Sequence, residues 1–272
     1  MPSPAELCRR FGLRPDKRIG QHFLADPAVV EAILDRAALN HADRVVEIGP
    51  GLGVMTLPLA QRAAHVTAIE VDPRLVAFLR QQLPASAPID VVEADALRFD
   101  FRSLPAPPYR LVANLPYHIT SPLLLHLLDQ GHCFTDLTVM VQREVADRLL
   151  ASPGEKDFGR LTLRVAYASE VASLLPVPAD AFYPPPQVDS TIVRLSVRPV
   201  PAVTVADPDA FFALIQRGYQ SRRKTLANNL KGLPGFTPNA LTACLADLGH
   251  PANVRAERLS LADWARVLEL LG

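Results

Sequence analysis

Four consecutive residues, Asn114-Leu115-Pro116-Tyr117, could hold a flat heterocycle that carries an amino group. They follow a short apolar run, residues 110–113, which is typical of a buried strand. The Asn114 amide oxygen can accept a hydrogen bond from a planar amine, and Pro116 stiffens the turn because its ring restricts φ. Tyr117 offers a ring face for stacking, a contact worth roughly 1–3 kcal/mol per base. The pattern indicates chemistry on the exocyclic amine of a nucleobase, although alone it also fits a strand end with a core tyrosine.

A second candidate site is a glycine-rich turn after an earlier apolar run. Gly49, Gly51 and Gly53 follow the predicted strand 44–48 with the spacing G-x-G-x-G. Glycine accepts positive φ and lets a ligand approach the backbone closely. A dinucleotide-binding turn has the spacing G-x-G-x-x-G, so this spacing favours a ligand without a pyrophosphate. S-adenosylmethionine (SAM), in which adenosine and an amino acid share a sulfonium, is such a ligand.

Two carboxylates follow the next two predicted strands. Glu70 ends the strand 65–69 and could accept hydrogen bonds from both hydroxyls of a ribose. Asp95 follows the strand 89–92 and could accept a hydrogen bond from the amino group of the cofactor's adenine. Either acid alone could be a solvated strand end or a helix cap. Together with the glycine turn, they predict a SAM site.

The elements that must position these residues alternate between apolar strands and amphipathic helices up to about residue 150. Such alternation predicts an α/β fold with a doubly wound, Rossmann-like sheet, in which ligands bind beyond the carboxyl ends of the strands. We interpret residues 1–25 as an irregular N-terminal segment, and the alternation over 161–167 predicts a strand. Residues 188–197 are predicted as the final strand.

Beyond about residue 200 the sequence becomes helical, beginning with one long helix predicted over 208–230. We therefore expect a catalytic, SAM-binding methyltransferase domain over residues 1–200 and a small helical domain over 201–272, for which RNA binding is the expected role.

Bulk properties narrow the class of protein. The 272 residues are 49% hydrophobic and carry no formal net charge, so any nucleic-acid surface must be local. We expect no membrane span, because no apolar stretch reaches 18 residues, and no secretory signal, because charges run through the first 25 residues. The expected location is the cytoplasm. The three cysteines are widely separated and the histidines lack metal-site spacing, so no metal is expected.

Taken together, these motifs resemble those of the ribosomal RNA adenine dimethyltransferase family, and most of all its bacterial small-subunit branch. The similarity runs in family order from about residue 8 to the C-terminus. The matching stretches are Gly20–Leu24, Val46–Gly51, Ile69–Asp72, Asp95-Ala96, Asn114–Tyr117, Gln142–Val145, Phe182–Ser190 and Arg222–Leu226.

The resemblance implies SAM-dependent dimethylation of the N6 amine of two adjacent adenosines in small-subunit (16S) rRNA, with a role in small-subunit biogenesis. The implied partner is the 30S subunit or its precursor, and a monomer is the default expectation. His22 departs from the family, in which asparagine is the commoner residue. The implied cofactor contacts are His22, Leu24, Gly49, Gly51, Glu70, Asp95 and Asn114, and the implied contacts to the target adenine are Asn114, Leu115, Pro116, Tyr117 and Phe182.

Arg222, Arg223 and Lys224 form the clearest local basic cluster and are predicted to contact RNA phosphates. Without the family context, they could be a solvated helix face. Other functions stay open at this point: an assembly factor that acts mainly by binding, a methylase of large-subunit rRNA, or a DNA adenine methylase.

Overall fold

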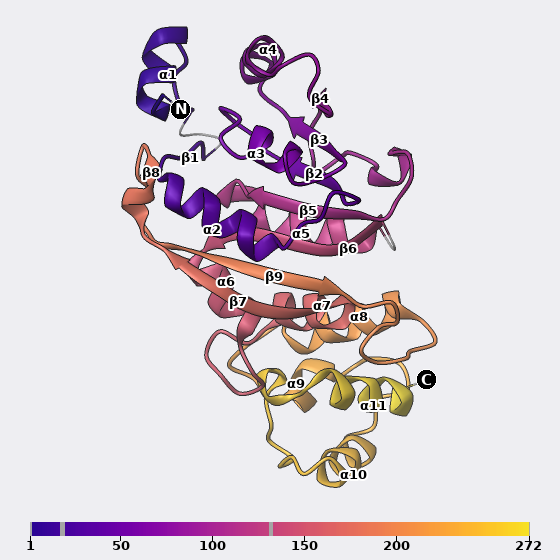
Figure 1. Cartoon of the computed structure of the whole chain (residues 1–272). Helices are drawn as coiled ribbons and strands as arrows, with labels where there is room; N and C mark the ends of the chain where they lie inside the picture. The colour runs from indigo at the N-terminus through magenta and orange to yellow at the C-terminus, as the bar shows by residue number, and fades with distance from the viewer. Residues whose placement is uncertain (1, 17–19, 131–132, 272) are drawn as a thin grey trace. The chain divides into compact units, whose positions relative to one another are not determined.

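The computed structural model describes residues 2–16, 20–130 and 133–271. The chain divides into two compact units (Figure 1). The first contains Met1–Ala146 and Glu170–Val197, and the second contains Asp147–Ser169 and Arg198–Gly272. Among the helices in the described ranges, none is long and apolar enough to cross a membrane.

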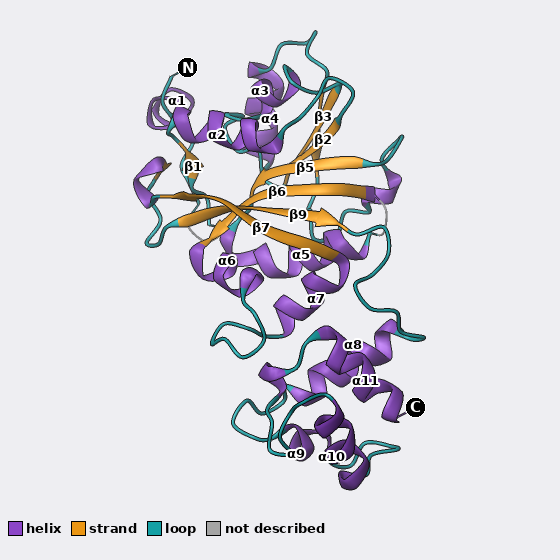
Figure 2. Cartoon of the chain, turned by 60° about the horizontal axis from the view of Figure 1, so that its bottom comes forward, coloured by secondary structure: helices purple, strands orange, loops and turns teal. Residues whose placement is uncertain are grey.

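Within the described ranges, seven strands form the main sheet in the order β4-β3-β2-β5-β6-β9-β7 (Figure 2). The strands β4, β3, β2, β5 and β6 run parallel to one another, and β9 pairs antiparallel with β6. From β2 the chain builds β3 and β4 on one side and then returns to β5 on the other, so the strand order reverses between β2 and β5. The bounds are β2 (Arg44–Ile48), β3 (His65–Glu70), β4 (Ile89–Glu93), β5 (Tyr109–Asn114), β6 (Phe134–Gln142), β7 (Ser169–Val177) and β9 (Ser190–Val197).

Helices cover both faces of this sheet, which confirms the predicted doubly wound α/β fold. Helices α2 and α3 lie on one face and α5 lies on the other (Figure 2). Helix α2 begins as its sequence predicts, because the Asp26 side chain accepts from the Ala28 N–H at 2.8 Å and Pro27 takes the first helical position. The bounds are α2 (Pro27–Ala37), α3 (Thr56–Ala60), α4 (Pro73–Gln82), α5 (Thr120–Asp129) and α6 (Arg143–Leu150).

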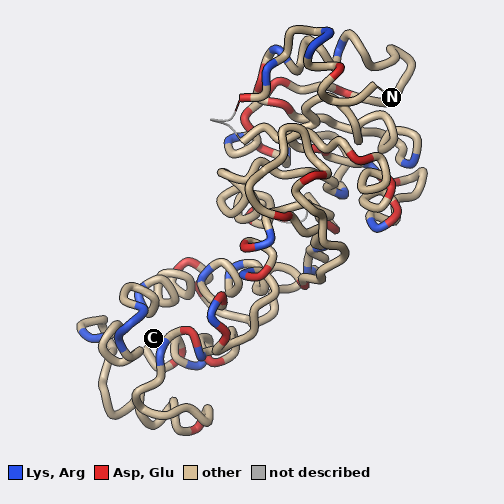
Figure 3. Tube along the Cα trace, turned by 90° about the vertical axis from the view of Figure 1, so that its left-hand side faces the viewer, with Lys and Arg blue, Asp and Glu red and all other residues tan. Residues whose placement is uncertain are grey.

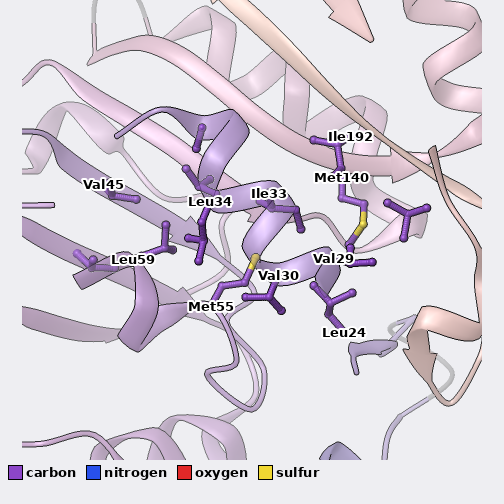
Figure 4. Close-up of a cluster of buried hydrophobic side chains, with 14 of the residues drawn as sticks. Leu24, Val29, Val30, Ile33, Leu34, Val45, Met55, Leu59, Met140 and Ile192 are labelled. Carbon is purple, nitrogen blue, oxygen red and sulfur yellow. The ribbon is translucent and has the colours of Figure 1, made fainter. Parts of the chain in front are cut away.

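The core beneath α2 holds the sheet in place under the site. Val30, Ile33 and Leu34 of α2 pack against Val45 of β2 and Met140 of β6 (Figure 4). Each of these side chains is buried. Burial of an aliphatic side chain of this size contributes roughly 1.5–3 kcal/mol, so this cluster anchors the strand ends that carry the site.

The N-terminal segment is more ordered than the sequence suggested. Residues Pro4–Phe11 form helix α1, which contradicts the irregular structure expected for 1–25. The Glu6 N–H donates to Ser3 Oγ, while the Glu6 carboxylate accepts from the Ser3 N–H at 2.7 Å, so both ends of a capping box are present. Further along, β1 (Phe23–Leu24) pairs with β8 (Phe182–Tyr183), two short strands that were not predicted.

The strand predicted over 161–167 is also wrong, because Arg160–Ala168 is helix α7. Its buried residues Thr162, Leu163 and Val165 have helical spacing, and Leu163 packs in the core of the second unit. The Gly159 N–H donates to Thr162 Oγ1 at 3.2 Å and helps to start the helix. This segment was assigned to the first domain from its sequence, whereas in the structure it packs with the second unit.

The second unit is helical, but the long helix predicted over 208–230 is two helices. Helix α8 (Pro208–Gly218) ends where Gly218 packs against Trp264, and Thr225 caps the short helix α9 (Leu226–Leu230). The turn between them contains the three basic residues singled out above. The remaining helices are α10 (Pro238–Asp247) and α11 (Leu261–Leu271).

The Gly218–Trp264 contact gives a stability prediction. A Cβ at position 218 would lie 2.2 Å from Cη2 of Trp264. We expect Gly218→Ala to lower the free energy of unfolding by about 2–3 kcal/mol through overpacking. Urea unfolding followed by fluorescence reports this unit directly, because Trp264 is the chain's single tryptophan.

Gly159→Ala is the matched control, because a Cβ there meets no described atom within 4 Å. Its expected cost is below about 1 kcal/mol, the cost of a poorer N-cap. Equal losses in the two variants would contradict the packing explanation.

Candidate active site at the strand ends

A cavity of about 310 Å³ lies beyond the carboxyl ends of the parallel strands, where the strand order reverses. Its wall comes from the segment before β1, the turn after β2, the ends of β3 and β5, and the loop after β4. The structure therefore gathers residues that are far apart in the sequence. Of the predicted site residues, the wall includes His22, Leu24, Gly49, Gly51, Glu70, Asp95, Asn114, Leu115, Pro116 and Tyr117.

The glycine turn has the conformation that its spacing predicted. Gly49, Gly51 and Gly53 have φ of 66°, 58° and 75°, values that L side chains rarely adopt. A Cβ on Gly51 would lie 2.9 Å from the ring of Phe23, so the turn also needs glycine for its close contact with β1. A side chain at any of these three positions would therefore strain the backbone of the turn.

Glu70 braces this turn from the end of β3. Its Oε2 accepts from the Gly51 N–H at 3.2 Å, and its Oε1 accepts from the N–H groups of Val71 and Asp72 at 2.9 and 3.0 Å. Burial raises the pKa of Glu70, and the three N–H donors oppose that rise. An ionised carboxylate has about four acceptor positions, so Glu70 retains acceptor capacity toward the cavity.

Asp95 holds the loop after β4 in a similar way. Its Oδ1 accepts from the Leu97 N–H at 2.9 Å, which caps the turn that follows. Its Oδ2 lies 3.8 Å from Nε of Arg98, in a pair whose side chains are 43% and 89% exposed. The second oxygen is therefore open enough to accept from a ligand.

Asn114 presents an unused acceptor at the end of β5. Its Nδ2 donates to the main-chain carbonyl of His22 at 3.1 Å. Since a carbonyl can only accept, this bond determines which end of the amide is oxygen, and Oδ1 is left on the other side. That oxygen is buried and has no hydrogen-bond partner among the described residues. A buried acceptor without a donor is costly, so a ligand amino group that reached Oδ1 would satisfy it.

Tyr117 is held at both its hydroxyl and its ring. The hydroxyl hydrogen-bonds Ser190 Oγ at 2.7 Å. The ring lies against the imidazole of His22, with centroids 5.6 Å apart and an interplanar angle of 24°. Burial raises the pKa of Tyr117 above its ordinary value of 10, so the phenol is neutral at physiological pH. Tyr117 therefore offers a ring face and no negative charge.

Phe182, predicted to contact the target adenine, does not line the cavity. It is buried in the core cluster beneath α2, and it is absent from the wall of the cavity as the described residues form it. Its backbone pairs with Leu24 in the β1–β8 ribbon. The ring that the structure places beside Tyr117 is the imidazole of His22, for which the sequence predicted only a cofactor contact.

Glu47 is a buried charged-type residue on the cavity wall to which sequence reasoning gave no role. Its carboxyl is 1% exposed, and neither oxygen has an aligned hydrogen-bond partner within the described ranges. Burial raises its pKa from 4.5 to about 8; the Thr56 hydroxyl opposes this rise and the neighbouring Glu70 adds to it. A charged residue at the end of the apolar run 44–48 is the signal that could have identified it.

The predicted RNA contacts lie in the second unit. Arg222, Arg223 and Lys224 are exposed on the turn between α8 and α9. Arg222 Nη2 donates to the carbonyl of Lys156 at 3.1 Å, which ties this turn to the loop before α7. Basic and acidic residues are interspersed along the trace of this unit (Figure 3), so the unit is not basic throughout. Across the part of the chain that is described, no group of three or more His, Cys, Asp or Glu residues could hold a metal ion.

The parallel sheet, its reversed strand order, and the glycine turn and acids at its strand ends define a Rossmann-like methyltransferase. The model of one family, described as ribosomal RNA adenine dimethylase, matches residues 13–271. The chain belongs to the ribosomal RNA adenine dimethylase family, which confirms the resemblance seen in its motifs.

Relatives and solved structures agree with this assignment. Ribosomal RNA small subunit methyltransferase A of Pelotomaculum thermopropionicum is 43% identical over 98% of this chain and 96% of that protein. The protein of the same name from Moorella thermoacetica is 42% identical over 97% and 95%. A dimethyladenosine transferase from Plasmodium falciparum superposes with a TM-score of 0.75 at 27% identity, covering 90% of this chain and 96% of that one. The 23S rRNA methyltransferase ErmE gives a TM-score of 0.72 at 29% identity, covering 92% and 99%.

The buried Glu47 predicts how stability depends on pH. Its pKa of about 8 in the folded protein exceeds 4.5, so between these values the folded state binds a proton that the unfolded chain releases. Stability should therefore fall as pH rises from about 4.5 through 8, by a few kcal/mol at most. Glu47→Gln should remove this contribution. The free energy of unfolding of the variant, relative to that of the wild type, should therefore increase between pH 5.5 and pH 8.5.

Urea unfolding followed by circular dichroism at the two pH values measures this difference. Glu93→Gln, at an exposed position on β4, is the control and should follow the wild type at both. If Glu47→Gln shows the same pH dependence as the wild type, Glu47 is not the titrating group.

Proposed function

We propose that this protein uses SAM to dimethylate the N6 amines of two adjacent adenosines in small-subunit (16S) rRNA. The observation that carries the proposal is the buried, orphaned Oδ1 of Asn114, a residue in the wall of the cavity at the strand ends, beside a glycine turn. The names of the relatives described above supply the small subunit as the substrate class.

The residues present fit SAM as the methyl donor. Glu70, with acceptor capacity remaining, would take the ribose hydroxyls, and Asp95 Oδ2 would accept from the adenine amine of the cofactor. Gly49 and Gly51 would let the backbone approach the ligand closely. Leu24 supplies apolar wall, and His22 lies beside it. When bound, SAM supplies a methyl group on a positively charged sulfur.

The protein's own contribution is to orient the target amine. The lone pair of the adenine N6 is delocalised into the ring, which makes the amine a weak nucleophile. A hydrogen bond from N6–H to Asn114 Oδ1 favours a tetrahedral nitrogen and directs its lone pair. Holding the reactants in the attacking geometry, at separations of about 3–3.5 Å, can lower the barrier by roughly 7–11 kcal/mol. The proton of the methylated amine is acidic enough to leave to water.

The target base must leave its stack to reach this site, at a cost of a few kcal/mol. The Tyr117 ring offsets that cost by stacking. Because Tyr117 is neutral and Asn114 does not titrate, neither acts as a strong base. One N–H remains after the first transfer, so the same acceptor can orient the amine for a second.

Binding of the subunit would rest in part on the exposed Arg222, Arg223 and Lys224. Phosphate contacts of this kind position RNA without reading its sequence. The expected substrate is the 30S subunit or a precursor of it.

The direct test is mass analysis of rRNA after small and large ribosomal subunits are each incubated with the protein and SAM. We expect a gain of two methyl groups on each of two adjacent adenosines of small-subunit rRNA. Labelling confined to the large subunit would instead support the second candidate function, which the likeness to a 23S rRNA methyltransferase raises. An assembly factor that acts by binding alone would label neither.

Asn114→Ala separates chemistry from cofactor binding. We expect turnover to fall by about 10²–10³-fold, because the lost acceptor acts mainly in the transition state. The Kd of SAM, measured by isothermal titration calorimetry, should change by less than about three-fold. Asn253→Ala, at an exposed position in the second unit, is the control. Near-normal turnover in Asn114→Ala would refute the role assigned to this acceptor.

The basic turn can be tested without breaking the tie from Arg222 to the Lys156 carbonyl. The double variant Arg223→Ala, Lys224→Ala should bind small subunits more weakly at low salt. The slope of log K against log salt should fall by about 1.4–1.8, which corresponds to two lost phosphate contacts. Arg266→Ala, whose guanidinium pairs with Glu269, is the control. An unchanged salt slope in the double variant would place the RNA elsewhere.

A further inference from the structure

His22 contacts the residues around the target base in three ways. Its carbonyl accepts from Asn114 Nδ2 at 3.1 Å. Its ring stacks in an offset arrangement on the ring of Tyr117. Its Nδ1 lies 2.8 Å from the carbonyl of Pro184, just after β8. One residue of the N-terminal segment therefore joins the turn after β5 to the segment after β8.

The hydrogen bond to Pro184 limits what the imidazole can do for the cofactor. A carbonyl only accepts, so Nδ1 must carry the proton in this bond. A neutral imidazole has one N–H, and here it is committed. In the neutral ring this leaves Nε2 as an acceptor only.

The stacking contact has a different consequence for Tyr117. The bond to Ser190 Oγ holds the phenol at its hydroxyl, which lies on the axis about which the ring rotates. That bond therefore fixes the tip of the side chain and leaves the ring free to turn. A flat ring packed against one side, at an interplanar angle of 24°, restricts this rotation.

We infer that His22 is a positioning residue for the target adenine, an inference that rests on the proposed function. Its imidazole holds the Tyr117 ring at the orientation that receives the base, and its carbonyl holds the Asn114 amide so that the oxygen is left as an acceptor unpartnered among the described residues. Both groups are thereby arranged before RNA binds. The side chain of His22 serves the base rather than the methyl donor.

Backbone geometry near His22 supports this assignment. Gly20, with φ of 64°, lets the N-terminal segment approach the turn after β5, because a Cβ there would lie 3.3 Å from Nδ1 of His118. Immediately after His22, Phe23 pairs with Tyr183, and the Ala25 N–H donates to the Ala181 carbonyl at 2.7 Å. The imidazole is thus carried on a segment that is fastened on both sides.

Kinetics of His22 variants distinguish the two roles. With saturating SAM and small subunits, His22→Ala should lower kcat by about three- to ten-fold, as expected for the loss of one aromatic stack. The Kd of SAM should stay within about two-fold of the wild type. His22→Phe, which keeps a flat ring but not the bond to Pro184, should recover most of kcat. His41→Ala, at an exposed position before β2, should match the wild type.

Fluorine NMR tests the contact without any reaction. Protein labelled with 3-fluorotyrosine should give a resonance for each of its five tyrosines, and Tyr117→Phe identifies the one from Tyr117. That resonance should move in His22→Ala and return toward its wild-type position in His22→Phe. The resonances of Tyr109, Tyr167 and Tyr219 should stay in place; Tyr183 is not a control, because it precedes Pro184 and pairs with Phe23.

The outcomes separate this inference from the proposed function. A ten-fold weaker Kd for SAM in His22→Ala with unchanged kcat would make His22 a cofactor contact and overturn the inference. A Tyr117 resonance that does not respond to His22→Ala would overturn it as well. Failure of the wild type to methylate either subunit would refute the proposed function, whereas the NMR measurement would still decide whether His22 orients Tyr117.

Discussion

The site depends on one hydrogen bond, from the Asn114 amide to the carbonyl of His22. Without it the amide could rotate, and the end of β5 would present a donor or an acceptor with similar ease. With it, the oxygen points away from the His22 carbonyl and is a buried acceptor that no described group satisfies, which is energetically costly. The free protein thus carries an unsatisfied acceptor, which the amino group of the proposed substrate would satisfy.

That bond in turn requires the N-terminal segment to stay where it is. The Phe23 ring lies so close to Gly51 that a side chain at position 51 would clash with it. The pairing of β1 with β8 holds the same segment through its backbone. Glu70 then links the same glycine turn to the end of β3. The half of the cavity proposed for the methyl donor and the half proposed for the base are therefore parts of a single set of contacts around β2 and β5.

Much of this arrangement could be predicted from the sequence, because it follows from strand order. Residues directly after parallel strands must meet at one edge of the sheet, so Gly49, Glu70, Asp95 and Asn114 converge as expected. Phe182 could not be placed this way, because it lies in a short ribbon whose pairing depends on contacts distant in sequence. Alternation over 161–167 misled for a related reason: Thr162 is buried through its hydrogen bonds, which apolar periodicity does not register.

Helix α1 was missed although its signal is present in the sequence: Ser3 and Glu6 have the spacing of a capping box. Its apolar residues Leu7 and Phe11 pack with Phe23 and Phe78, so the helix buttresses the segment that carries His22. A cap motif is local and readable, whereas the position of the imidazole against Tyr117 is set by three segments at once. The turn Asn114–Tyr117 could therefore be recognised in the sequence, but its contact with the His22 ring becomes visible only in three dimensions.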